Sequence, residues 1–119
     1  MSEAESPAIL VLVRELMFSG KISAEARAAG VAIKIIGNPA DLALFAQTTA
    51  GMLIVDLNLA EAIVAAAAWG RVAGRCVVGF VSHVDAQTIA RAREAGIKQV
   101  LARSQFVSIL PELVRRQAR

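Results

Sequence analysis

The sequence predicts an α/β fold in which a parallel sheet of five strands is covered by helices on both faces. Five short apolar runs alternate with five segments of helical character along the 119 residues. A glycine closes a helical segment just before a strand at residues 27–31 and again at residues 93–97. The run at residues 52–55 is wholly apolar and ends on Asp56, as expected of a strand buried on both faces of the sheet.

The first part of the chain predicts two strands separated by a helix. Residues 8–13, AILVLV, form an unbroken apolar run that is typical of a central strand. A helix is expected over residues 17–29, with Gly30 as its C-terminal stop. Residues 31–36 predict the next strand, and Lys34 within it is typical of an edge or half-exposed position.

The rest of the chain continues the alternation. Pro39 suits the first turn of a helix that runs to about residue 47. Asp85 is a good N-cap, and Pro111 lies inside the last helical segment, where a kink or a restart is expected. The remaining strands are expected at residues 52–55, 76–81 and 98–101, and the remaining helices at residues 61–69, 86–95 and 104–116.

Composition limits the classes of protein to which the chain can belong. With 56% hydrophobic and 19% charged residues, residues 1–119 are expected to form one domain, with residues 1–7 as a flexible leader. The net charge of +3 is scattered and aromatic residues are few, so no nucleic-acid partner is expected. The longest apolar run, residues 62–69, is too short to span a membrane. The start, MSEAESP, is not a signal peptide, so the cytoplasm is the expected location.

Residues at the ends of four predicted strands resemble those of the receiver domains of two-component response regulators. Asp56 ends the third strand, as the phosphoacceptor aspartate of that family does. Ser82 ends the fourth strand, where the family keeps a Ser or Thr that hydrogen-bonds the phosphoryl group. Arg103 follows the fifth strand in VLARSQF, where the family has a lysine. Arg14 and Glu15 end the first strand, where the family has paired acids that hold Mg²⁺.

This resemblance covers nearly the whole chain and implies a flavodoxin-like, doubly wound sheet with strand order 2-1-3-4-5. Arg14 departs from the family because a cation replaces the first metal-binding acid. Arg103 departs from it because a planar guanidinium replaces the compact ammonium of lysine. The Met-Pro that commonly follows the aspartate is also missing. The chain therefore resembles an atypical receiver with a degraded acid pair, and this argues against phosphorylation of Asp56.

The roles of the five candidate site residues have alternatives. Mg²⁺ is the cofactor that the resemblance implies, and Glu15 with Asp56 could form a weakened site for it. An inward-pointing Arg14 would instead compete with the metal or pair with Asp56. Ser82 could contact a phosphoryl group or an anion, or bond to the backbone at the strand end. Arg103 could pair with Asp56 and Glu15, or clamp a phosphate or carboxylate together with Arg14.

The sequence gives no support for catalysis by the common routes. It contains no Gly-rich phosphate loop, no G-x-S-x-G motif and no Cys–His pair at suggestive positions, so the protein is not expected to be an enzyme. His83 is the only histidine and has no second ligand at metal spacing. It is expected to bond locally or to line the rim of a pocket.

The leading hypothesis is a stand-alone, receiver-like signalling module that acts through protein–protein contacts. The contact is expected with a partner protein or with a second copy in a homodimer, through residues 86–116 (Ala86 to Arg116), the part of the fold that this family often uses. The competing hypothesis is a module that binds a small anion or a nucleotide with Arg14, Ser82 and Arg103. A third hypothesis is a structural adaptor with a vestigial pocket.

Overall fold

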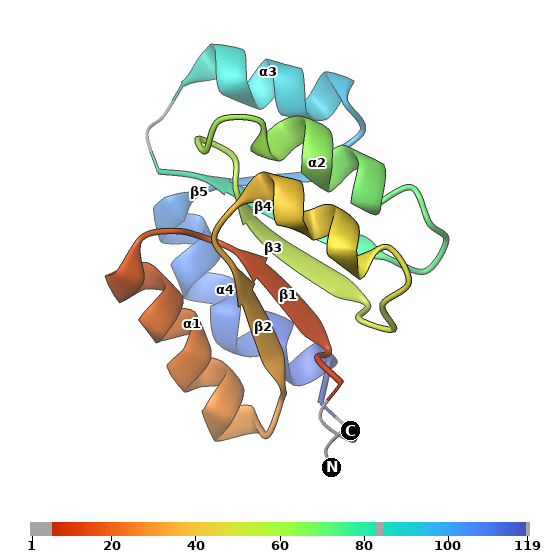
Figure 1. Ribbon diagram of the computed structural model, residues 1–119. Coiled ribbons are helices and arrows are strands. Elements are labelled where there is room, and N and C mark those ends of the chain that lie inside the picture. The colour runs from red at the N-terminus through yellow and green to blue at the C-terminus, as the bar shows by residue number, and fades with distance from the viewer. Residues whose placement is uncertain (1–5, 83–84, 119) are drawn as a thin grey trace.

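The computed structural model describes residues 6–82 and 85–118, and these form a five-stranded sheet in the order β2-β1-β3-β4-β5 (Figure 1). All four pairs of neighbouring strands are parallel. The predicted strand order and direction are thus confirmed. The strands are β1 (Ile9–Leu12), β2 (Ile33–Ile36), β3 (Met52–Asp56), β4 (Cys76–Val81) and β5 (Gln99–Ala102).

Helices cover both faces of this sheet, which is the doubly wound arrangement that the sequence predicts (Figure 1). Two helices lie on one face and three on the other. On the first face are α1 (Leu16–Ala29) and α4 (Arg103–Arg116); on the second are the 3₁₀ helix η2 (Pro39–Phe45), α2 (Ala62–Trp69) and α3 (Ala86–Glu94).

The side chains of each strand alternate between two cores because successive residues of a strand point to opposite faces. In β3, Met52 and Ile54 pack into the core under α1 and α4. Leu53 and Val55 pack into the core under η2, α2 and α3. Because β3 pairs with β1 on one side and β4 on the other, residues 52–55 are almost fully buried. The strand continues one residue further than predicted and includes Asp56.

Two glycines end helices in the way that the repeated sequence pattern indicates. Gly30 is the C-cap of α1 in the left-handed region, with φ 72°. Gly96 follows α3 with φ 102° and leads toward β5. A side chain is strained in this backbone conformation, so glycine allows each helix to end and the chain to turn toward the next strand.

Three predictions about the helices need correction. The segment after Asn38 is a 3₁₀ helix that ends at Phe45, and it is shorter than the expected helix to residue 47. The predicted restart at Pro111 is wrong, because α4 is one continuous helix through that residue. Helix α4 also begins one residue earlier than expected, so Arg103 is its first residue. No helix in the described ranges combines the length and the apolar character that a membrane span needs.

Candidate functional site

A pocket of about 260 Å³ lies at the carboxyl ends of β1, β3 and β4, on the side of the sheet covered by α1 and α4. The strand ends supply its polar groups, and the first turns of α1 and α4 close it. Ligands bind at this edge in open α/β sheets. The pocket is lined by Val13, Glu15, Phe18, Asp56, Phe80, Ser82 and Arg103.

The carboxylate of Asp56 is held by hydrogen bonds from its own loop and from the end of β4. Its Oδ1 atom accepts from the backbone N–H of Asn58 at 3.0 Å. The hydroxyl of Ser82 lies 3.3 Å from both carboxylate oxygens and donates its single proton between them. No arginine or lysine in the described ranges lies within ion-pair distance of Asp56. Among the described residues, hydrogen bonds from Asn58 and Ser82, and not an ion pair with a basic side chain, therefore hold this carboxylate.

The side chain of Asn58 forms a hydrogen bond that connects the loop after β3 to the end of β4. This role was not predicted from the sequence. The Asn58 Oδ1 atom accepts from the backbone N–H of Ser82 at 2.6 Å. Asn58 and Ser82 thus contact each other and each also contacts Asp56. The only signal in the sequence is an asparagine two residues after the strand-terminal acid, a position where short polar side chains often bond to nearby backbone.

Glu15 and Arg103 form an ion pair across the mouth of the pocket. The Arg103 Nη2 atom lies 2.9 Å from Glu15 Oε1, and the two side chains are 42% and 51% exposed. The guanidinium also lies over the ring of Phe18, with 4.2 Å between its central carbon and the ring centroid. The structure thus contains one of the two ion pairs expected of Arg103, that with Glu15, and not the pair with Asp56.

Arg14 lies away from this pocket. Its Nε atom donates to the backbone carbonyl of Gly37, after β2, at 3.0 Å. Strand alternation explains the separation: Val13 points into the core under α1 and α4, so its neighbour Arg14 leaves the sheet on the other side. Among the described residues, Arg14 does not pair with Asp56, and it does not line the pocket that Arg103 lines.

The architecture is shared with solved structures of response regulators, although no family model and no curated protein matches the sequence. An orphan response regulator of H. pylori superposes with a TM-score of 0.76 at 14% identity, over 97% of this chain and 98% of that one. A response regulator from Hahella chejuensis gives 0.76 at 17% identity, over 94% and 95%. A CheY-like receiver domain protein from Methanospirillum hungatei gives 0.74 at 11%, over 93% and 95%.

The chain has the receiver-domain fold. At identities this low, the likeness concerns the fold alone and does not extend to the chemistry of the site. Three of the residues that carry the resemblance in sequence, Asp56, Ser82 and Arg103, do line one pocket of this receiver fold. Glu15 joins them there.

Of the two acids expected to hold Mg²⁺, Glu15 and Asp56, one already has a cationic partner among the described residues. Only two carboxylates line the pocket, and Glu15 is already paired with Arg103. In the described part of the chain no three acids, histidines or cysteines are grouped so that they could hold a metal ion. His83, expected at the pocket rim, lies outside the described residues. Mg²⁺ is usually held by one or two carboxylates together with several waters. In the described part of this pocket, Asp56 is the carboxylate that has no basic side chain beside it.

An aromatic cluster forms the floor of the pocket. The rings of Phe18 and Phe80 have centroids 4.9 Å apart, and Phe80 stacks on Phe106 at 5.0 Å. Phe106 is fully buried. The candidate site is therefore a hydrogen-bonded carboxylate and a separate ion pair above an apolar base.

Proposed function

We propose that this protein is an atypical receiver-like signalling module that acts by binding a partner protein, without metal-dependent phosphorylation of Asp56. The receiver fold supports the signalling class. The observation that carries the proposal is the ion pair between Glu15 and Arg103, because it places a guanidinium beside the one acid that could share a metal with Asp56. Arg14, at the position of the other metal-binding acid, contacts Gly37 instead.

Hydrogen bonds connect the two strand ends that supply Asp56 and Ser82 to the pocket. Ser82 and Asn58 join the loop after β3 to the loop after β4. Both loops lead into helices of the second face, α2 and α3. We expect a partner to recognise the protein without a phosphoryl group, so that recognition depends on the amount of each protein.

Phosphorylation can be tested directly. The protein is incubated with acetyl phosphate and Mg²⁺, its intact mass is measured, and Asp56→Asn serves as the control. We expect no gain of a phosphoryl group in either protein at saturating metal. A gain of one phosphoryl group that requires Asp56 would overturn the proposal that Asp56 is not phosphorylated. It would not affect the assignment of the receiver fold.

The partner surface is proposed to lie within residues 86–116, on α3, β5 and α4. In this part of the described chain Ile109 is the large apolar residue exposed to solvent, at 37%. Substitution Ile109→Glu is expected to abolish a specific complex or a homodimer, measured by analytical ultracentrifugation and affinity capture. Leu44→Glu, at an exposed position on η2, is the matched control. If Asp56→Asn also abolished this complex, partner binding would depend on the Asp56 pocket. That result would contradict the proposal that binding is independent of the pocket.

The anion-binding hypothesis has less support. Of its three groups, Ser82 and Arg103 line the pocket, whereas Arg14 does not. Ser82 and Arg103 are already bonded to Asp56 and Glu15. A ligand that binds only the folded protein must raise its melting temperature. We therefore expect that phosphate and nucleotides do not raise the melting temperature of the unaltered protein. A rise that Arg103→Met removes would contradict this expectation.

A further inference from the structure

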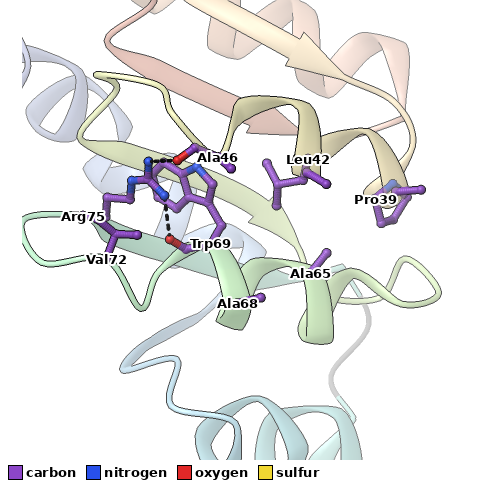
Figure 2. A pocket seen from close by; sticks show the side chains of 10 residues that line it. Pro39, Leu42, Ala46, Ala65, Ala68, Trp69, Val72 and Arg75 are labelled. Atoms are coloured by element: carbon purple, nitrogen blue, oxygen red, sulfur yellow. Dashed lines mark hydrogen bonds between the residues drawn. The ribbon is translucent and has the colours of Figure 1, made fainter.

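A second pocket, of about 400 Å³, lies between η2 and α2 on the other face of the sheet (Figure 2). Figure 2 shows Pro39 at one end, Arg75 and Val72 at the other, and the indole of Trp69 between them. A pocket of this size with mainly apolar walls is of the kind that holds small molecules. It is lined by Pro39, Ala40, Leu42, Ala43, Ala46, Ala65, Ala68, Trp69, Val72 and Arg75.

Small side chains leave the space between the two helices open. Ala43 and Ala46 line the pocket from η2 and the residue after it, and Ala65 and Ala68 line it from α2. Trp69 fixes the distance between the helices, because its indole Nε1 donates to the carbonyl of Phe45 at 3.3 Å. The opening is therefore built into the packing of η2 against α2.

Arg75 places a positive charge at one end of this apolar pocket. Its Nη1 donates to the carbonyl of Trp69 at 3.1 Å, and its Nη2 to the carbonyls of Ala46 at 2.7 Å and Thr48 at 3.3 Å. The guanidinium lies over the Trp69 ring, with its central carbon 4.5 Å from the centroid. No carboxylate in the described ranges pairs with it.

Among the described residues, the charge of half-buried Arg75 is therefore matched by carbonyl dipoles and the Trp69 ring, and not by a carboxylate. A guanidinium has five N–H groups, and the three bonds account for three of them. An anionic group beside a half-buried, unpaired guanidinium gains charge-assisted hydrogen bonds. None of the residues that line the pocket is acidic, so nothing in the lining repels an anion.

We propose that this pocket binds a small carboxylic acid with an aromatic or branched aliphatic body. The apolar body lies along Leu42, Ala68 and the indole of Trp69, and the carboxylate lies at Arg75. The apolar walls supply affinity by removing the body from water. The guanidinium selects the acid over an uncharged molecule of the same shape. This site is separate from the Asp56 pocket and does not depend on the proposed signalling function.

Trp69 reports on the pocket because it is the only tryptophan and the chain has no tyrosine. The unaltered protein is titrated with 4-phenylbutyrate and with 4-phenyl-1-butanol, which share one apolar body, and Trp69 emission is followed. We expect saturable binding of both, with the acid bound about fivefold more tightly. Equal affinities, tighter binding of the alcohol, or no saturable change up to the solubility limit of the acid would overturn the proposal.

Two alanine substitutions locate the binding. Ala68→Leu places a larger side chain into the pocket from an exposed position of α2, and we expect it to weaken binding of the acid about tenfold. Ala28→Leu is the matched control at an exposed position of α1 and leaves binding unchanged. Equal binding by both variants would overturn the assignment. If the unaltered chain bound no acid but formed a dimer that Ala68→Leu abolished, the proposal would be overturned. The pocket would then be the contact site of a second copy of the chain. If Ala68→Leu does not fold, the comparison of acid and alcohol still decides the ligand class.

Discussion

The pocket at Asp56 and the pocket at Arg75 differ in how their charges are balanced. At the carboxyl end of the sheet, Arg103 is bonded to Glu15, and Asp56 accepts hydrogen bonds from Ser82 and from backbone. Between η2 and α2, Arg75 donates only to carbonyl oxygens and faces apolar walls. Among the described residues, the first pocket holds one ion pair and a carboxylate, Asp56, that is bonded to neutral donors, whereas the second holds a cation without a counter-anion.

This difference indicates at which pocket an anionic ligand would gain more binding free energy. Removing a charge from water is costly unless that charge is paired and hydrogen-bonded. A ligand anion at Arg75 supplies the missing charge, whereas a ligand at Arg103 must first displace Glu15. A residue that resembles a family's functional residue is thus not by itself the best place to expect a ligand.

The largest expected effect comes from Arg75. Arg75→Met removes three hydrogen bonds that hold the ends of η2 and α2 and also the contact with the Trp69 ring. We expect the free energy of unfolding to fall by about 3 kcal/mol, measured by urea denaturation. Arg71→Met, at a neighbouring exposed position, is the control and should change it by less than about 0.5 kcal/mol. Equal effects of the two substitutions would show that Arg75 does not hold the helices together.

Gly79 gives the next largest effect and tests the packing of the core under η2, α2 and α3, on the opposite side of the sheet from the Asp56 pocket. A Cβ atom at Gly79 would lie 2.7 Å from Cδ1 and 2.8 Å from Cγ of Leu57, which is buried. Leu57 cannot easily move because its N–H donates to the carbonyl of Phe80 at 2.9 Å. We expect Gly79→Ala to lower the free energy of unfolding by about 2 kcal/mol.

The matched control for this substitution is Gly20, in the middle of α1. A Cβ atom there meets nothing within 4 Å. Gly20→Ala should therefore stabilise the protein by about 0.5–1 kcal/mol through helix propensity. Destabilisation of similar size at both positions would mean that the effect at Gly79 does not come from the clash with Leu57.

The fold could be predicted from the sequence because each strand is a compact apolar run and each boundary carries its own signal. Residues 76–81 were predicted with the bounds that β4 has. Asp85 was predicted as the N-cap of α3, and its side chain accepts from the backbone of Gln87 and Thr88. The type of the η2 helix was not predicted, since a proline in its first turn indicates a helix start but does not distinguish a 3₁₀ helix from an α-helix.

The site could be predicted only in part. The direction of Arg14 follows from strand alternation, which places it opposite Glu15 across the sheet, so this separation was available in the sequence. Arg75 carried no such signal. Its partners Ala46 and Thr48 lie 29 and 27 residues away in the chain, and contacts of that kind appear only once the helices are packed.

A smaller effect is expected from the exposed pair of Glu15 and Arg103. The double-mutant cycle of Glu15→Gln and Arg103→Met should give a coupling energy of about 0.5 kcal/mol, because both side chains are close to half-exposed. The coupling should become smaller in about 1 M salt, which screens exposed charges. A coupling above about 2 kcal/mol would show a desolvated pair and would contradict the expectation for two side chains that are close to half-exposed.

The smallest expected effect concerns Asp85, a hydrogen-bonded acid outside both pockets that serves as a reference for Asp56. Its carboxylate accepts from the Thr88 hydroxyl at 2.8 Å, and this bond is the main cause that lowers the pKa of Asp85 below 3.8. A lowered pKa in the folded state means that the ionised acid stabilises the fold above pH 3.8 and that this stabilisation is lost as the pH falls further. The difference in melting temperature between the unaltered protein and Asp85→Asn should thus be constant at neutral pH and shrink below pH 3.8. Thr88→Val removes the hydroxyl that is the main cause of the lowered pKa of Asp85, so it should reduce this pH dependence. A difference in melting temperature that does not change with pH would contradict the prediction.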